Sequence, residues 1–138
     1  IFDSRVITRY LDDFAGSNLY PQDKIYDILT LEALADGIME SAVSITYESK
    51  LRPENEQSPS WMEAQWSKVL HAVKALDDGE FKAMDGEINM GQIALACALG
   101  YLDFRHDARQ WRIGHSNLAS WNDKMRKLPA LIKTIPTD

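Results

Sequence analysis

Apolar side chains recur every three or four residues along most of this chain, which is the spacing of one face of an α-helix. The clearest stripe lies within residues 22–52, which contain no proline, and consists of Ile28, Leu31, Ala35, Ile38, Ala42 and Ile45. Pro53 follows and predicts the end of this long helix. No segment alternates apolar and polar residues for long enough to form a half-buried strand. The pattern therefore predicts an all-α fold, a bundle of helices.

A second long helix is predicted after the polar loop at residues 53–59. Ser60 and Glu63 have the spacing of a capping box, in which two side chains satisfy free amide groups at a helix start. The segment 77–79 (Asp-Asp-Gly) is predicted to end this helix. Its buried face is expected to consist of Met62, Trp66, Val69, Leu70, Val73 and Leu76.

The segment 93–101 is apolar on all sides and rich in small residues, which is typical of a helix surrounded by neighbours. Asn89 is the expected N-cap of this helix, and Gln92 is expected to return the hydrogen bond. We expect this helix at the centre of the bundle, with Cys97 as a small buried core residue. A further helix is expected at about residues 116–128, capped by the serine or the asparagine at its start, and a short turn of helix is expected after Pro129, ending at Pro136.

The N-terminal segment is predicted to be a separate short helix. Asp3 and Ser4 are good N-cap residues, and the turn-forming segment 16–21 (GSNLYP) separates this helix from the rest of the chain. The chain opens at Ile1, within an amphipathic pattern and without an initiator methionine. We therefore expect it to be part of a longer protein.

Charge and cysteine content narrow the possible functions. The chain has 138 residues, 15 basic and 21 acidic side chains and a net charge of −6. Nucleic-acid binding is disfavoured because phosphate contacts need a basic patch. Cys97 is the single cysteine, so no intramolecular disulfide can form and a cytoplasmic location is expected. No apolar run approaches the ~20 residues that cross a bilayer, and we expect no membrane association.

The sequence contains no familiar catalytic or metal motif. His71, His106 and His115 do not stand at metal-ligand spacing with other histidines or with cysteines. No serine lies in a G-x-S-x-G elbow, and no glycine-rich phosphate loop occurs. We therefore expect no bound metal.

Two polar groups nevertheless suggest a ligand. Asp3 and Ser4 stand at a helix N-terminus, where free amides and the helix dipole favour an anion, and an acidic neighbour can hold an ammonium. On the long helix, Asp36 and Glu40 are like charges one turn apart, which repel each other and favour a cationic partner. The plain alternatives are an ordinary N-cap and a solvated acidic face.

Several segments carry a family resemblance in a fixed order. Residues 3–11 (DSRVITRYL) are similar to the pattern (Glu/Asp/Gln)-Ser-x-Ala-Ile-x-x-Tyr-Leu. Residues 88–96 (INMGQIALA) are similar to the helix start Ser/Thr-x-Ala-Asp-Ile, and residues 117–136 are similar to Pro-x-Leu-x-x-Trp…Met…Pro…Thr-x-Pro. Together with the linker, these segments resemble the C-terminal part of a bacterial cytosolic glutathione S-transferase over essentially the whole chain.

The resemblance implies glutathione as cosubstrate and assigns roles to individual residues. Ser4 is expected to bind the γ-glutamyl carboxylate through its amide and hydroxyl, with Asp3 near the γ-glutamyl amino group. Glu40, in the Gly-Ile-x-acidic position of residues 37–40, is expected to reach the amino group of glutathione in the partner subunit of a homodimer. The pocket for a small electrophile is expected to be lined by Met39, Val43, Tyr47 and Trp111.

The resemblance also divides the chain and locates the chemistry. It implies that residues 1–15 are the last helix of a thioredoxin-like domain, 16–21 the linker and 22–138 the all-helical C-terminal domain. The Ser, Tyr or Cys that activates the glutathione thiol lies outside such a segment, so this chain alone is expected to be inactive. Gln92 replaces the usual Asp, which exchanges a charge-assisted bond for a neutral one, whereas Asn89 caps well.

Three functions therefore stay open for the parent protein. The first is a glutathione transferase that conjugates glutathione to small electrophiles. The second is a glutathione-transferase-like interaction module without catalysis, since a fold does not fix a function. The third is a glutathione-dependent thiol-exchange enzyme that uses an N-terminal catalytic cysteine.

Overall fold

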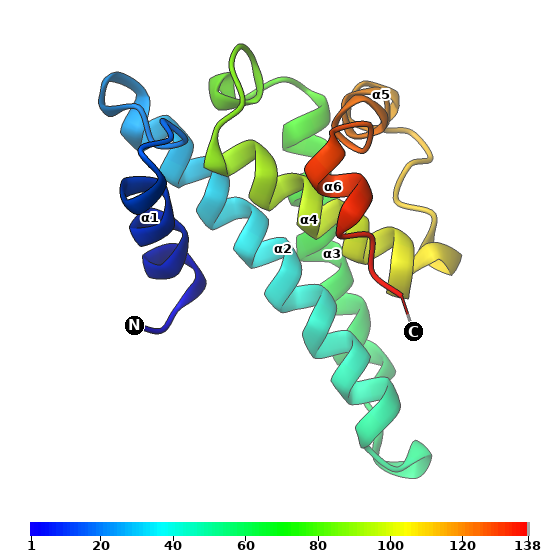
Figure 1. Ribbon diagram of the computed structural model, residues 1–138. Helices are drawn as coiled ribbons and strands as arrows, with labels where there is room; N and C mark the ends of the chain where they lie inside the picture. Colours follow the sequence, from blue (N-terminus) through cyan, green and yellow to red (C-terminus); the bar gives the residue numbers. More distant parts are fainter. Residues whose placement is uncertain (138) are drawn as a thin grey trace.

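The computed structural model describes residues 1–137 (Figure 1). Within this range the chain forms α-helices and short 3-10 helices and no strand, so the prediction of an all-α fold is confirmed. The α-helices are α1 (Ser4–Ala15), α2 (Ile25–Leu51), α3 (Pro59–Asp77), α4 (Met90–Arg105), α5 (Ser116–Met125) and α6 (Pro129–Lys133). The 3-10 helices are Gln22–Lys24, Glu54–Glu56, Lys82–Met84 and Asp107–Arg109.

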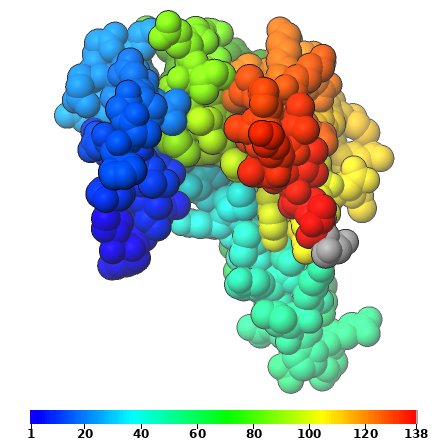
Figure 2. Space-filling model, viewed as in Figure 1, coloured from blue at the N-terminus to red at the C-terminus, as the bar shows by residue number. Residues whose placement is uncertain are grey.

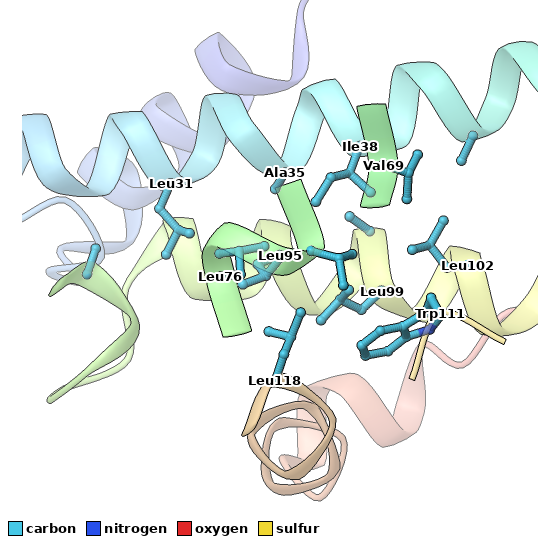
Figure 3. Close-up of a cluster of buried hydrophobic side chains, with 14 of the residues drawn as sticks. Leu31, Ala35, Ile38, Val69, Leu76, Leu95, Leu99, Leu102, Trp111 and Leu118 are labelled. Carbon is cyan, nitrogen blue, oxygen red and sulfur yellow. The ribbon is translucent and has the colours of Figure 1, made fainter. Parts of the chain in front are cut away.

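The core lies where α2 packs against α3 and α4. Figure 3 shows the buried side chains that meet there, with Trp111 and Leu118 closing one side. The three helices contribute Leu31, Ala35, Ile38, Val69, Leu76, Leu95, Leu99 and Leu102. Each buried Leu or Ile stabilises the fold by about 1.5–3 kcal/mol. The apolar stripes predicted for these helices therefore form one common core.

The start of α4 lies very close to the start of α2. A Cβ atom added to Gly91 would lie 2.9 Å from the carbonyl oxygen of Ile28 and 3.0 Å from Cβ of Leu31. Because a backbone carbonyl cannot move aside cheaply, this crossing requires glycine.

The two residues expected to form a reciprocal cap at the start of α4 make different hydrogen bonds from each other. Asn89 is the N-cap, and its Oδ1 accepts a 3.1 Å hydrogen bond from the amide of Gln92. Gln92 does not return this bond, contrary to our expectation. Its buried Nε2 instead donates to the carbonyl of Ala83 at 3.0 Å, which Asn89 Nδ2 also reaches at 2.8 Å. Both side chains therefore fix the turn before α4, because that turn leaves a carbonyl without a backbone partner.

Two other helix starts also differ from the prediction. Ser60 does not cap α3, and Glu63 instead forms an ion pair with Arg109 at 2.8 Å. Neither the serine nor the asparagine at the start of α5 caps it. The amide of Leu118 in its first turn donates to Oδ1 of Asp77, at the end of α3, at 2.8 Å. A carboxylate from a neighbouring helix thus satisfies a free amide that local sequence patterns assign to a local cap.

The N-terminal helix α1 ends as predicted. Gly16 adopts a left-handed conformation with φ 61°, and its amide donates to carbonyls of the last turn. The carboxylate of Asp12 then accepts hydrogen bonds from the hydroxyl of Ser17 and from the amide of Leu19, which holds the following segment against the helix. No helix within residues 1–137 combines the length and the apolar character needed to cross a bilayer.

Candidate functional site

The N-terminus of α1 and the middle of α2 enclose a small cleft of about 260 Å³. We call it the α1–α2 cleft. Its lining residues are Asp3, Ser4, Arg5, Asp36, Met39, Glu40 and Val43. It therefore brings together five residues that the sequence assigned to glutathione or electrophile binding, although they come from two separate helices.

The start of α1 has an unusual backbone geometry. Asp3 has φ 74° and ψ 128°, a conformation that non-glycine residues rarely adopt and that costs of order 1–3 kcal/mol. Its Oδ1 accepts a 3.0 Å hydrogen bond from the amide of Arg5, so Asp3 is the N-cap. Ser4 is the first helical residue, which places its amide and hydroxyl at the positive end of the helix dipole.

Acidic groups dominate the electrostatics of the α1–α2 cleft. Nε of Arg5 lies 3.4 Å from a carboxylate oxygen of Asp36 and 3.7 Å from one of Asp3. Burial raises the pKa of Asp36, Arg5 lowers it, and the nearby carboxylates of Glu40 and Asp3 raise it further. The guanidinium of Arg5 thus pairs with two carboxylates, and the third carboxylate, that of Glu40, interacts with Asp36. Glu40 is exposed and has no ion-pair partner within residues 1–137, so the cleft can accommodate one further cation.

A second cleft of about 380 Å³ lies beside the first, and we call it the α4 cleft. Met39 borders both clefts. Figure 2 shows the hollow between α1 (blue) and the C-terminal segment (red). The remaining lining residues are Ala96, Cys97, Gly100, Tyr101, Asp103, Phe104, Arg126, Leu131, Thr134, Ile135 and Pro136. A mostly apolar cleft next to a polar one can hold a ligand with one apolar and one charged end.

Cys97 faces this second cleft and is exposed, so its expected position in the core was wrong. The helix α4 buries Leu95, Leu99 and Leu102 on the opposite face. An apolar face is compatible with a cleft as well as with a core, which explains the error. The surrounding protein raises the pKa of the Cys97 thiol by desolvation.

Two of the expected pocket residues lie elsewhere. Trp111 is only 2% exposed and donates a 2.8 Å hydrogen bond from Nε1 to Asp103, so it is a core residue and its assignment to the pocket was wrong. A large apolar ring with a hydrogen-bonded N–H is stable in a core. Tyr47 is 61% exposed and lies in a groove at the far end of α2 and α3, beside Trp61, rather than in either cleft.

Sequence reasoning missed a buried hydrogen-bonded group between α1 and α2. Glu32 is 2% exposed, and its Oε1 accepts a 2.7 Å hydrogen bond from the hydroxyl of Tyr20. The hydroxyl of Thr8 on α1 lies 2.8 Å from that of Tyr20. The available signal was the position of Glu32, four residues after Ile28 and three before Ala35, which puts a carboxyl beside the apolar stripe of α2.

The histidines do not form a metal site. His106 is buried, and its Nε2 donates to the carbonyl of Ala42 at 2.9 Å, while burial lowers the pKa of the ring. His115 contacts the carbonyl of Trp111 through Nδ1 at 2.7 Å. Across the described residues, no group of three or more His, Cys, Asp or Glu side chains is arranged to hold a metal ion.

Comparison with known proteins identifies the class of protein. The family model of the glutathione S-transferase C-terminal domain matches residues 59–123. A glutathione transferase family member from Pseudomonas fluorescens Pf-5, crystallised with bound S-(propanoic acid)-glutathione, is 38% identical and superposes with a TM-score of 0.95 over 100% of this chain and 72% of its own. This chain belongs to the glutathione transferase family.

Two further relatives agree with this membership. A glutathione S-transferase from Methylobacillus flagellatus KT, crystallised with bound glutathione, is 32% identical with a TM-score of 0.91 over 99% of this chain and 70% of its own. The uncharacterized GST-like protein YibF of Escherichia coli K12 is 29% identical over 142 residues, which cover 98% of this chain and 69% of that protein.

Proposed function

We propose that this chain is the substrate-pocket and dimerisation domain of a glutathione transferase, together with the last helix of its thioredoxin-like domain. The observation that carries the proposal is the α1–α2 cleft, in which Asp3 and Ser4 meet the acidic face of α2 and which continues into the apolar α4 cleft at Met39. The glutathione conjugate bound by the Pseudomonas relative and the glutathione bound by the Methylobacillus relative support glutathione as the ligand here. Residues 16–21 are then the linker between the two domains.

In this proposal the charged end of glutathione occupies the α1–α2 cleft. The amide and hydroxyl of Ser4 bind the γ-glutamyl carboxylate at the N-terminus of α1. Asp3 binds the γ-glutamyl ammonium through a charge-assisted hydrogen bond. Glu40 serves the same ammonium in the partner subunit of a homodimer, and its exposed, unpaired carboxylate supports that role.

The electrophile occupies the α4 cleft, which Met39 and Cys97 help to line. The glutathione thiol loses its proton, its sulfur forms a bond to the electrophilic carbon, and the leaving group departs with the bonding electrons. In an addition reaction the carbon next to the attacked one takes up a proton instead. The residue that activates the thiol belongs to the preceding domain, so this chain contributes binding and not activation.

A basic side chain in the α4 cleft narrows the kind of conjugate that fits. Arg126 lines this otherwise mostly apolar cleft and contacts Asp103 through Nη1 at 3.3 Å, while remaining half exposed. A small carboxylate on the electrophile can pair with the exposed part of the guanidinium. The S-(propanoic acid)-glutathione bound by the Pseudomonas relative carries such a carboxylate, which supports this assignment.

Isothermal titration calorimetry of glutathione into the full-length protein tests the proposal. We expect saturable binding by wild type and binding weakened about 10- to 150-fold by Asp3→Ala or Glu40→Ala, because a charge-assisted hydrogen bond is worth about 1.5–3 kcal/mol. A glutathione analogue without the γ-glutamyl amino group is the control, since it should bind wild type and both variants equally. Absence of binding by wild type would reject the transferase and favour the non-catalytic interaction module. Unchanged binding by Glu40→Ala would reject the cross-subunit role of Glu40.

The thiol-exchange alternative requires a catalytic cysteine in the preceding domain. It is tested by comparing conjugation of an electrophile with reduction of a mixed disulfide of glutathione. Conjugation without reduction is the expected result for the transferase.

A further inference from the structure

Among residues 1–137, the helix that carries Asp3 and Ser4 contacts the other elements mainly through polar side chains. No residue of α1 is buried, and its apolar side chains, including Val6, Leu11 and Phe14, are exposed. What joins α1 to α2 is instead polar: the Arg5–Asp36 ion pair, the stacking of Arg9 on Tyr20, and the hydrogen bonds of Thr8 with Tyr20 and Glu32. The position of the candidate ligands on α1 therefore depends on a few polar contacts.

Glu32 is the buried centre of these contacts. Its Oε1 accepts hydrogen bonds from Tyr20 at 2.7 Å and from Thr8 at 3.4 Å, and these two hydroxyls are 2.8 Å apart. Its Oε2 is buried and has no hydrogen-bond partner among residues 1–137. A chain of hydrogen bonds thus runs from α1 through the linker residue Tyr20 to α2.

The unpartnered Oε2 favours the neutral form of Glu32. An ionised carboxylate with one buried, unpartnered oxygen loses its hydration without compensation, whereas the neutral acid loses much less. Burial and the nearby carboxylate of Asp36 raise the pKa of Glu32, while Tyr20, Thr8 and Arg5 lower it. Arg5 does not neutralise Glu32 directly, because its guanidinium is paired with Asp36 at 3.4 Å. Tyr20 stays protonated as a donor, since burial raises its pKa and Glu32 raises it further.

We propose that Glu32, as a neutral carboxylic acid, is a positioning residue that latches α1 onto α2 and thereby sets the position of Asp3 and Ser4 on α1 relative to Met39 on α2, where the two clefts meet. The consequence for glutathione binding rests on the proposed function, but the latch itself does not. Glutathione affinity and the order of α1 should therefore depend on the same buried carboxyl, although it lines neither cleft.

Hydrogen exchange of the α1 amides, measured by mass spectrometry on the full-length protein, tests the latch without any ligand. We expect Glu32→Ala to speed exchange in α1 about tenfold or more and Glu32→Gln to leave it near wild type, since an amide reproduces the neutral acid. Glu56→Ala, at an exposed carboxylate remote from α1, is the matched control and should change nothing. If Glu32→Ala leaves α1 protection unchanged, or if Glu32→Gln behaves like Glu32→Ala, the latch is rejected.

The pH dependence of α1 exchange and of glutathione binding distinguishes a latch that requires the neutral acid from a merely structural role of Glu32. As the pH rises through the raised pKa of Glu32, wild-type α1 should lose protection relative to α2, and glutathione should bind more weakly, whereas Glu32→Gln should lack this step. Identical profiles for wild type and Glu32→Gln would also reject the proposal. If Glu32→Ala fails to fold, Tyr20→Phe removes the donor alone and should loosen α1 in the same way. If α1 responds as expected but wild type binds no glutathione, the latch stands and the proposed function fails.

Discussion

Nε1 of Trp111 donates a 2.8 Å hydrogen bond to Oδ1 of Asp103, and the same carboxylate accepts hydrogen bonds from Arg112 and Arg126. One carboxylate on α4 therefore fixes a buried ring in the connection to α5 and two guanidinium groups around the C-terminal end of α5. This cluster closes the side of the core that faces away from α2, and it also borders the α4 cleft through Asp103 and Arg126.

The first prediction concerns this cluster. Asp103→Ala leaves the indole N–H of Trp111 without an acceptor in the core, so we expect unfolding free energy to fall by about 2–3 kcal/mol. Asp123→Ala is the control, because that carboxylate also pairs with Arg112 but its side chain is 63% exposed, and we expect a change within about 0.5 kcal/mol. Urea denaturation measures both. Equal losses in the two variants would show that the contact with Trp111 contributes nothing.

Two glycines in helices should respond oppositely to substitution by alanine. Gly91→Ala places a Cβ atom 2.9 Å from the carbonyl oxygen of Ile28, so the start of α4 must shift and we expect a loss of about 1–3 kcal/mol. Gly37 lies within α2 with no atom within 4 Å of an added Cβ, so Gly37→Ala should raise stability by about 0.5–1 kcal/mol. Thermal denaturation of the full-length variants gives both signs. A stabilising Gly91→Ala would contradict the close packing of α4 on α2.

Cys97 offers a direct test of the α4 cleft. Because its side chain is exposed, we expect Cys97 to react with N-ethylmaleimide in the native protein, as read from the peptide that contains it, whereas a buried core cysteine would react only after unfolding. The raised pKa of Cys97 should make the reaction slower at neutral pH than that of a free thiol and faster as pH increases. Cys97→Ser is the control and should remove the labelling of this peptide. Labelling only in denaturant would mean that the native protein buries this face of α4.

The sequence predicted the helices better than the site because helices follow from local spacing. The apolar stripe from Ile28 to Ile45 needed only a period of three to four residues, and it forms the core as expected. Cys97 was placed in the core from its apolar neighbours, but hydrophobicity alone cannot tell an apolar cleft from an apolar interior. Trp111 was placed in the pocket by the resemblance alone, which does not fix the burial of an individual side chain.

Contacts between segments that are distant in the sequence were not predicted, for a related reason. Asp77 caps the first turn of α5 from the end of α3, and Glu32 receives its donors from α1 and the linker. In both cases a carboxylate reaches its hydrogen-bond donor only after the helices have packed. The spacing of residues along the chain therefore does not predict the contact. The residues of the α1–α2 cleft could be predicted together only because the resemblance assigned Asp3, Ser4 and Glu40 to the same ligand.

The last prediction concerns pH. Nε2 of His106 donates to the carbonyl of Ala42 at 2.9 Å, and the ring packs against Trp66, so the folded protein favours neutral imidazole and the pKa lies below the ordinary 6.5. The unfolded state therefore binds more protons in this range, and stability contributed by His106 is present above about pH 6.5 and is lost as pH falls through the lowered pKa. Glu32 has the opposite tendency, since its raised pKa favours the folded state at low pH.

A comparison of variants separates the contribution of His106 to the pH dependence of stability from the contributions of the carboxyl groups. We expect His106→Gln to lower stability at neutral pH and to remove the loss that wild type shows on acidification below about pH 6.5, measured by urea denaturation at several pH values. His71→Gln, at an exposed position on α3, should reproduce the wild-type profile. If the wild-type and His106→Gln curves stay parallel across this range, His106 is not proton-linked to folding, and the contact with Ala42 holds the ring in both charge states.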